Sequence, residues 1–443
     1  MLNHHHEISQ KLDEFTLLEH YHHHEMPMDT RSWLFVCGKN DHYQLMCKPS
    51  SSSSEEGNNK TIISCLITPQ LSEWYKIMDD VIAIANGDIH TLFLTKSGQV
   101  FGIGNNQQGQ LGAENVDLIS NLIRIPVKDD VKVTSIICGS FHSMLLGSNG
   151  SVYVAGDSSF HQLGIEDQEI VTEFTKVQFP EPNTHVSLIA TSYSHSVCYC
   201  ENGNKVFGMG SVFEDIYGDA YCTPQLLPLF QNKFNCTLKT IQAGYRYTLF
   251  LTSENEVYLH GKFERTLYAQ PIKISIPNIR NIFAGGNHYF LETLDSKFYG
   301  CGLNDDKQIP FYSETVTITP VEITPPQQFS DFRITSIAAG SYHTGVVTAC
   351  GRIYTCGWNE LGQLGSNTKA YSVECSPLHM DLSVQLDISR GTTAVKIFMS
   401  PSADNTFLWF RRIREKLQFF IRLFQKIQGV TARFSDIAVH TIT

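Results

Sequence analysis

Histidines recur along this chain at a spacing that could serve catalysis or metal binding. His90, His142 and His343 each stand three residues after a glycine, in G-x-x-H segments. Imidazole acts as a general base or as a metal ligand because its ordinary pKa lies near neutrality. A shared ion would require several of these side chains to converge on one point. The elements that carry the histidines therefore decide between a reactive role and a structural one.

The histidine position belongs to a unit that recurs six times. Its occupants, at intervals of 41 to 55 residues, are His90, His142, His195, Tyr247, His288 and His343. The glycine that ends a later apolar run of each unit is Gly104, Gly156, Gly210, Gly261, Gly302 and Gly357. The glycine ahead of the histidine position is Gly87, Gly139, Gly244, Gly285 and Gly340. A period of about 50 residues predicts a repeat architecture.

Repetition favours a structural role for the histidines. Each unit holds its histidine in an equivalent place, so the positions are too dispersed to share one ion. We expect each histidine to bond the backbone of an adjacent strand or loop. The segment GIGNNQQGQLG at 102–112 lacks the Lys-Ser/Thr of a phosphate-binding loop, and we interpret it as a turn between strands. The sequence thus predicts no catalytic residue, no cofactor and no metal site.

Each unit is composed of short strands. Apolar runs rich in Val, Ile, Phe and Tyr alternate with turn residues, as in VIAIANGDIHTLFLTKSGQVFGIG at 81–104. No helical period runs through any copy. One unit is a thin antiparallel sheet, which must stack on its neighbours to bury both faces. This pattern predicts an all-β propeller.

The two ends of the repeat region contain incomplete units. Residues 32–40 match the late half of a unit, and residues 395–408 match the early half. With the six complete copies, these halves predict a seven-bladed β-propeller over residues 32–409. Its seventh blade would be shared by the N- and C-terminal segments, which would cover the two sheet edges of an open ring.

The G-x-x-H, V-Y-x-x-G-x-N and G-Q-L-G elements resemble the regulator of chromosome condensation repeat. The resemblance is strongest at 81–112 and 334–365. It implies a β-propeller and, through the founding member of the family, guanine nucleotide exchange on a small GTPase such as Ran. In that exchange factor an acidic residue just before a repeat histidine engages the GTPase. The residues in that place here are Ile89, Phe141, Ser194, Arg246, Asn287 and Tyr342, none of them acidic.

Two functions of different class follow. The favoured hypothesis is a non-enzymatic protein-interaction scaffold that binds protein partners through propeller rim loops. Long, dissimilar connections at 211–236, 262–279 and 303–331 break the repeat, and such loops carry selectivity. The alternative is a guanine nucleotide exchange factor for a Ran-like or other small GTPase, which rests on the resemblance alone.

Two segments near the N-terminus differ from the repeats. Residues 1–31 form a His-rich arm, with HHH at 4–6 and YHHHE at 21–25. No cysteine partners accompany these histidines at zinc-finger spacing, so we expect a flexible arm that binds no metal. Residues 49–60, PSSSSSEEGNNK, are polar and of low complexity, and are predicted to form a surface loop.

The C-terminal segment has a different pattern. Residues 410–428 predict an amphipathic basic helix whose apolar side includes Ile413, Leu417, Phe420 and Phe424. This helix would pack on the propeller or, as alternatives, contact a partner or a membrane surface. In the tail at 429–443, FSDI resembles the opening of a BTB domain.

Composition narrows the classes of partner. The 443 residues include 33 basic and 44 acidic side chains, for a formal net charge of −11. An acidic surface disfavours nucleic acid, because phosphate binding needs clustered Lys and Arg. Twelve cysteines without a signal peptide favour free thiols in a reducing compartment. We therefore expect a cytoplasmic protein, with nuclear entry as the alternative.

Overall fold

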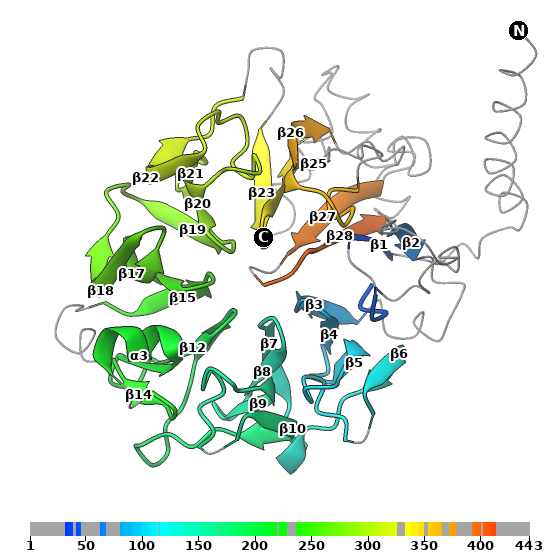
Figure 1. Cartoon of the computed structure of the whole chain (residues 1–443), viewed down its shortest axis with the longest axis vertical. Helices are drawn as coiled ribbons and strands as arrows, with labels where there is room; N and C mark the ends of the chain where they lie inside the picture. The colour runs from blue at the N-terminus through cyan, green and yellow to red at the C-terminus, as the bar shows by residue number, and fades with distance from the viewer. Residues whose placement is uncertain are drawn as a thin grey trace, which may run out of the picture. The chain divides into compact units, whose positions relative to one another are not determined.

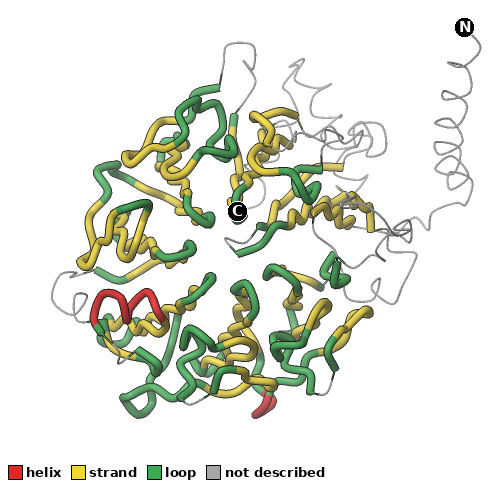
Figure 2. Tube along the Cα trace, in the orientation of Figure 1, coloured by secondary structure: helices red, strands yellow, loops and turns green. Residues whose placement is uncertain are grey.

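The described strands form seven four-stranded antiparallel sheets, set around a common centre within the unit Ser32–Thr443 (Figure 1). They belong to a computed structural model. It describes residues 32–38, 41–45, 63–67, 80–114, 116–166, 168–218, 221–227, 236–325, 333–349, 353–365, 372–377, 392–399 and 402–412. Strand dominates this part of the chain, as the tube view also shows (Figure 2). None of its helices is long and apolar enough to cross a membrane.

Six sheets are blades of four consecutive strands each. The first two blades contain β3 (Val81–Asn86), β4 (His90–Thr95), β5 (Val100–Asn105) and β6 (Leu118–Arg124), then β7 (Val133–Cys138), β8 (His142–Gly147), β9 (Val152–Asp157) and β10 (Ile170–Lys176). The next two contain β11 (Leu188–Thr191), β12 (His195–Cys200), β13 (Lys205–Gly210) and β14 (Gln225–Leu226), then β15 (Leu238–Ala243), β16 (Tyr247–Thr252), β17 (Val257–Phe263) and β18 (Thr266–Lys273). The fifth and sixth contain β19 (Ile279–Ala284), β20 (His288–Thr293), β21 (Phe298–Leu303) and β22 (Val316–Glu322), then β23 (Ile334–Ala339), β24 (His343–Thr348), β25 (Ile353–Trp358) and β26 (Ser372–Pro377).

The remaining sheet, which we call the closing sheet, is a composite of the chain ends. It has the order β2 (Ile63–Ile67), β1 (Ser32–Gly38), β28 (Asn405–Arg412) and β27 (Thr392–Phe398). Its central pairing runs antiparallel from Ser32 with Arg411 to Gly38 with Asn405. The prediction of seven blades is therefore wrong, because the remaining sheet does not have the strand connectivity of a blade. Six blades are formed by consecutive strands, and a composite sheet of different connectivity closes the ring.

The predicted C-terminal helix is wrong at its start. Strand β28 continues through Phe410 to Arg412, because its backbone pairs with β1 on one side and β27 on the other. Residues 413–443 lie outside the described part, and with them Ile413, Leu417, Phe420, Phe424 and the FSDI segment. Among the described residues, helix is limited to α3 (Ser211–Tyr217) and the 3-10 turn η3 (Lys128–Asp130).

The hydrophobic core is divided into layers between neighbouring blades. The second strand of each blade is buried along its whole length, as in HTLFLT of β4, because blades cover it on both faces. Outer strands such as β10 alternate between buried and exposed residues. Leu92 and Leu94 of the first blade share one cluster with Leu145 and Tyr153 of the second. Each blade thus depends on its neighbours for burial.

The recurring glycine at the end of the third strand is fixed by backbone geometry. Gly104 has φ of +117°, and its equivalents in the other five blades have φ between +102° and +116°. A Cβ atom at Gly104 would also lie 2.5 Å from the carbonyl oxygen of Ile89. Both constraints exclude a side chain, which explains why glycine recurs there.

Candidate interaction face

The repeat histidines connect neighbouring sheets. His90 Nε2 lies 2.8 Å from Ser143 Oγ of the next blade. The equivalent pairs are His142 with Thr191 at 2.6 Å, His195 with Thr248 at 2.9 Å, His288 with Thr344 at 3.0 Å and His343 with Thr406 at 3.1 Å. Each hydroxyl belongs to the following sheet, so the histidines fasten one sheet to the next around the ring. They bind a side-chain hydroxyl, not the backbone that the sequence suggested.

The hydroxyl groups fix the direction of these hydrogen bonds. Ser143 Oγ donates its proton to the carbonyl oxygen of Gln110 at 2.8 Å, so His90 Nε2 must be the donor of the pair. Thr406 likewise donates to the carbonyl oxygen of Gln363 at 2.8 Å. Nδ1 of His90 is buried with no hydrogen-bond partner among the described residues. This arrangement requires a neutral ring with its proton on Nε2.

Burial keeps the histidines neutral. It lowers the pKa of four of them to about 3, and the affected residues are His90, His142, His195 and His288. At neutral pH these rings carry no charge and have no exposed face toward solvent. Their role is therefore to bind neighbouring sheets, and they are not available as bases for a substrate in solution.

The glycine of the G-x-x-H segment makes room for the imidazole. A Cβ atom at Gly139 would lie 2.1 Å from Cε1 of His142, and one at Gly340 would lie 2.1 Å from Cε1 of His343. The ring folds back over the glycine that precedes it. Glycine and histidine therefore form one packing unit, and Gly87 and Gly285 occupy the same relation to His90 and His288.

The fourth blade uses tyrosine in place of histidine. The hydroxyl of Tyr247 lies 2.9 Å from the carbonyl oxygen of Gly285 and 2.6 Å from that of His288, both in the next blade. Its ring fits against Gly244, where a Cβ atom would lie 2.0 Å from Cε1 of Tyr247. A longer side chain thus reaches the backbone of the neighbour directly.

Burial also suppresses the reactivity of the cysteine thiols. It raises the pKa of the Cys138 and Cys301 thiols to about 12 and that of Cys200 to about 11. These thiols remain protonated at neutral pH and are poor nucleophiles. Among the described residues, no group of three or more His, Cys, Asp and Glu side chains could hold a metal ion.

A row of aromatic rings crosses one end of the ring of sheets. We call Phe160, Tyr193, Tyr245, Tyr342 and Trp358 the aromatic strip. Consecutive ring centroids are separated by 5.5, 6.1, 5.8 and 6.1 Å. The rings come from the second, third, fourth and sixth blades, so the strip joins segments far apart in the sequence. Phe160 is 38% exposed and Tyr193 is 42% exposed.

Gly286 allows the strip to pass the fifth blade. A Cβ atom at this position would lie 2.8 Å from Cε2 of Tyr245 and 2.5 Å from the carbonyl oxygen of Ser341. The missing side chain lets the Tyr245 ring extend across the fifth blade and contact Tyr342 in the sixth. Tyr245 is half-buried there, and burial raises its pKa above the ordinary value.

The strip lies at the acidic end of the ring. We call this end, which carries the loops between first and second and between third and fourth blade strands, the acidic face. Its described loops contain 14 acidic residues and three basic ones, none of them buried. The acidic residues are Asp41, Asp88, Glu114, Asp117, Glu166, Glu169, Glu214, Asp215, Glu264, Asp305, Asp306, Glu314, Glu360 and Asp404, and the basic residues are Arg246, Arg265 and Lys307. This imbalance gives the face a negative field.

Helix α3 and the central loops support the acidic face. Ser192 Oγ and Ser402 Oγ lie 3.0 Å apart and join the third blade to the closing sheet at the centre. Beside the strip, the N–H of Ser211 donates to the carbonyl oxygen of Phe160 at 3.0 Å. Asp215 of α3 pairs with Arg246, which occupies one of the few basic positions of this face. The strip therefore rests on loops that are bonded to one another.

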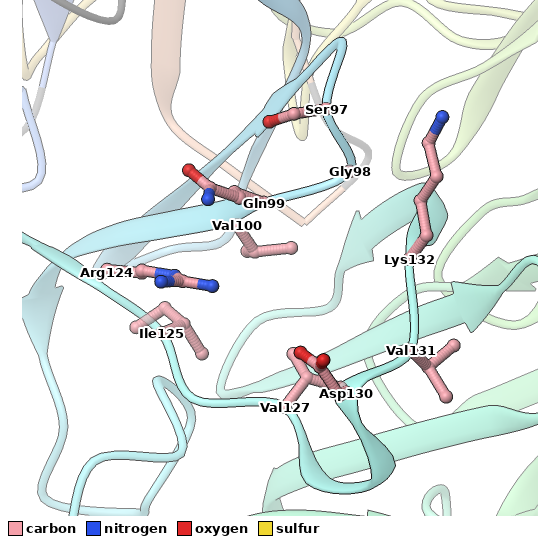
Figure 3. Close-up of a pocket in the computed structure, with 10 residues that line it drawn as sticks. All are labelled: Ser97, Gly98, Gln99, Val100, Arg124, Ile125, Val127, Asp130, Val131 and Lys132. Atoms are coloured by element: carbon pink, nitrogen blue, oxygen red, sulfur yellow. The ribbon is translucent and has the colours of Figure 1, made fainter.

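The opposite end carries a cleft between the first two blades. It has a volume of about 210 Å³ and is lined by Val100, Ile125 and Val131 together with Arg124, Asp130 and Lys132 (Figure 3). Figure 3 shows Lys132 extending away from Asp130. No histidine or cysteine lines the cleft. The described loops at this end contain five basic and eight acidic residues, so they lack the strong charge bias of the acidic face.

Comparison with known families agrees with the repeat pattern. The model of the Regulator of chromosome condensation (RCC1) repeat matches residues 81–110, 133–162 and 334–363, and a second model of the same repeat matches 97–146. These matches contain His90, His142 and His343 with their glycines. The chain contains regulator of chromosome condensation repeats at these residues. The predicted family is confirmed.

Individual proteins are similar to a larger part of the chain than the matched repeats. The chain is 26% identical over 292 residues to the X-linked retinitis pigmentosa GTPase regulator homolog of Caenorhabditis elegans, covering 65% of this chain but 20% of that protein. It is 25% identical to the secretion-regulating guanine nucleotide exchange factor of Bos taurus, covering 77% of each chain. The crystal structure of Prp20p from Saccharomyces cerevisiae, described with its binding properties to Gsp1p and histones, superposes with a TM-score of 0.69 at 18% identity. It covers 93% of this chain and shares its fold.

Sequence reasoning located the repeat positions but missed the aromatic strip. Its members fall at different places in the repeat: Tyr193 and Tyr245 stand two residues before the histidine position, while Tyr342 stands one before it. Phe160 and Trp358 belong to other segments of their blades. The only sequence signal was the doublet Gly285-Gly286, whose second glycine makes room for Tyr245.

Proposed function

We propose that this chain is a non-enzymatic protein-interaction scaffold, and that the acidic face with its aromatic strip is the surface that binds protein partners. The observation that carries the proposal is the strip itself, two of whose rings, Phe160 and Tyr193, are exposed to solvent. Exposed aromatic side chains dominate the energetics of protein interfaces. The neutral, buried histidines and the protonated thiols support a function without chemistry of their own.

Guanine nucleotide exchange on a small GTPase is the second candidate. It is supported by the similarity to the bovine exchange factor, which extends over 77% of both chains. Against it, no acidic residue stands directly before a repeat histidine. The nearest acidic side chain, Asp88, precedes Ile89 and so lies one position too early. We therefore favour the scaffold function over nucleotide exchange.

A comparison of bound proteins tests the proposal. Three proteins are immobilised separately: the wild-type chain, a strip variant with Phe160→Ala and Tyr193→Ala, and a cleft variant with Arg124→Ala and Lys132→Ala. The proteins that each of them retains are identified by mass spectrometry. We expect the strip variant to lose partners that the cleft variant keeps. Identical retention by all three proteins would contradict the proposal. Any retained GTPase is then assayed for nucleotide release, and acceleration by the wild-type chain would establish exchange.

A further inference from the structure

The aromatic strip and its surroundings specify the chemistry of a partner. The rings expose apolar area, while the loops around them carry a large excess of carboxylates. Asp404 is close enough to Tyr245 to influence its ionisation, so negative charge reaches the middle of the strip. At the other end, Glu214 and Asp215 of α3 follow Ser211, which is bonded to the backbone of Phe160, and these carboxylates already contact His161 and Arg246. A ligand on the strip therefore meets aromatic side chains and carboxylates together.

Arginine satisfies both features. Its guanidinium is planar and weakly hydrated, so it stacks on an aromatic ring and still forms paired hydrogen bonds with a carboxylate. Lysine offers charge but no planar group. Nucleic acid and a second acidic face of this chain are both disfavoured, because each would bring negative charge to a negative surface.

The spacing of the rings restricts the conformation of the partner. Neighbouring centroids are 5.5 to 6.1 Å apart along the strip. An extended chain advances about 3.3 Å per residue, and a polyproline II chain about 3.1 Å, so alternate residues are separated by about 6 to 7 Å. Side chains at every second position of an extended segment therefore match successive rings.

We propose that the aromatic strip binds an extended segment of a partner protein that carries arginine at alternate positions. This inference rests on the proposed scaffold function and names the chemistry of its ligand. The carboxylates of the acidic face pair with the arginines, and the rings set their spacing. The partner segment crosses from the second blade to the sixth along the strip.

Fluorescence anisotropy with labelled peptides tests the inference. The probe is a synthetic peptide of alternating serine and arginine, titrated with the full chain. One comparison peptide has the same composition with all arginines contiguous, and another replaces arginine with lysine. We expect the alternating arginine peptide to bind most tightly. Equal binding by the contiguous arginine peptide or by the lysine peptide would overturn the proposal.

Variants then locate the binding site. Phe160→Ala/Tyr193→Ala should weaken binding of the alternating arginine peptide by about tenfold, because two cation–π contacts are lost. Leu267→Ala/Ile318→Ala removes two other exposed apolar side chains, on β18 and β22, and should leave binding unchanged. An equal loss in both variants would overturn the assignment to the strip. Circular dichroism confirms that each variant is folded.

The two proposals fail in different ways. If the strip variant loses its protein partners but the wild-type chain does not bind the alternating arginine peptide, the scaffold function stands and the arginine inference is wrong. If protein retention is identical in all variants, the scaffold function is wrong as well.

Discussion

At the scale of single residues, each repeat histidine is a buried ring that bonds a hydroxyl of the following sheet. His90 donates a hydrogen bond to Ser143. The hydroxyl of Ser143 in turn donates a hydrogen bond to the carbonyl oxygen of Gln110, in the blade that carries the histidine. The same relation links His343, Thr406 and Gln363. Because each histidine bonds the following sheet, the five contacts point the same way around the ring. The glycine that precedes His90, His142, His288 and His343 is required by the same packing.

The coupling between glycine and histidine can be measured in the fifth blade. The three atoms nearest to a Cβ at Gly285 all belong to the His288 ring, at 2.4 to 2.8 Å. Gly285→Ala should therefore cost about 2–3 kcal/mol in a wild-type background. The same substitution in a His288→Ala background should cost less than about 1 kcal/mol, because the clash is gone. Urea unfolding of the four proteins measures both costs, and equal values would exclude the coupling.

At the scale of elements, α3 shows how a departure from the repeat is stabilised. Phe213 is fully buried, and its ring contacts His195 at a centroid distance of 5.6 Å and Tyr221 at 5.7 Å. It also stacks on His260 of the fourth blade at 5.9 Å. Tyr217 extends this stack, with its hydroxyl 2.9 Å from His260 Nε2. The helix therefore fixes the connection beside Phe160 by packing against two blades.

Substitutions within α3 separate packing from surface charge. Phe213→Ala should lower the free energy of unfolding by about 3–5 kcal/mol, because it leaves a cavity among stacked rings. Glu214→Gln, in the same helix, removes a carboxylate whose Oε1 lies 2.7 Å from Nδ1 of the exposed His161 and should cost less than about 1 kcal/mol. Thermal and urea unfolding measure both changes. A cost for Glu214→Gln that equals that of Phe213→Ala would contradict this account.

The elements also show what could be predicted from the sequence. Short apolar runs and the recurring His90 and Gly104 positions predicted the strands, because the repeat imposes the same backbone on each copy. The helix predicted from residue 410 failed, because pairing with β1 and β27 overrides the local pattern up to Arg412. The aromatic strip could not be predicted. Its rings meet only after the blades are arranged, and no period relates Phe160 to Trp358.

At the scale of the whole molecule, the ring separates charge between its two ends. One face concentrates carboxylates around the aromatic strip, while the other mixes both signs around the cleft that contains Arg124 and Lys132. Between these two faces, the repeat histidines form a buried neutral layer. The molecule therefore combines buried side-chain bonds at each boundary from the first blade to the closing sheet with one strongly polarised surface.

This buried layer makes the stability of the ring depend on pH. Besides the four histidines with a pKa of about 3, burial lowers the pKa of His260 to about 4. In the unfolded chain these groups bind protons below about pH 6.5. Stability is therefore complete above that value and falls as the pH decreases toward the folded pKa values. Each histidine contributes up to about 1.4 kcal/mol per pH unit.

Urea unfolding at pH 7, 6 and 5 measures this dependence. The slope of the unfolding free energy against pH should correspond to the uptake of several protons. His142→Gln should reduce that uptake by about one proton, in addition to lowering stability at pH 7. A slope that is unchanged in the variant would show that His142 is already protonated in the folded state.

The closing sheet has a consequence for synthesis of the chain. Gly38 pairs with Asn405, so the partner of β1 leaves the ribosome after almost the entire repeat region has been made. At a translation rate of about 5–20 residues per second, β1 waits roughly 20–70 s with one edge unpaired. An unpaired strand edge is a template for aggregation. During translation β1 is therefore the segment with the longest need for chaperone protection, although in the finished ring it lies between two partner strands.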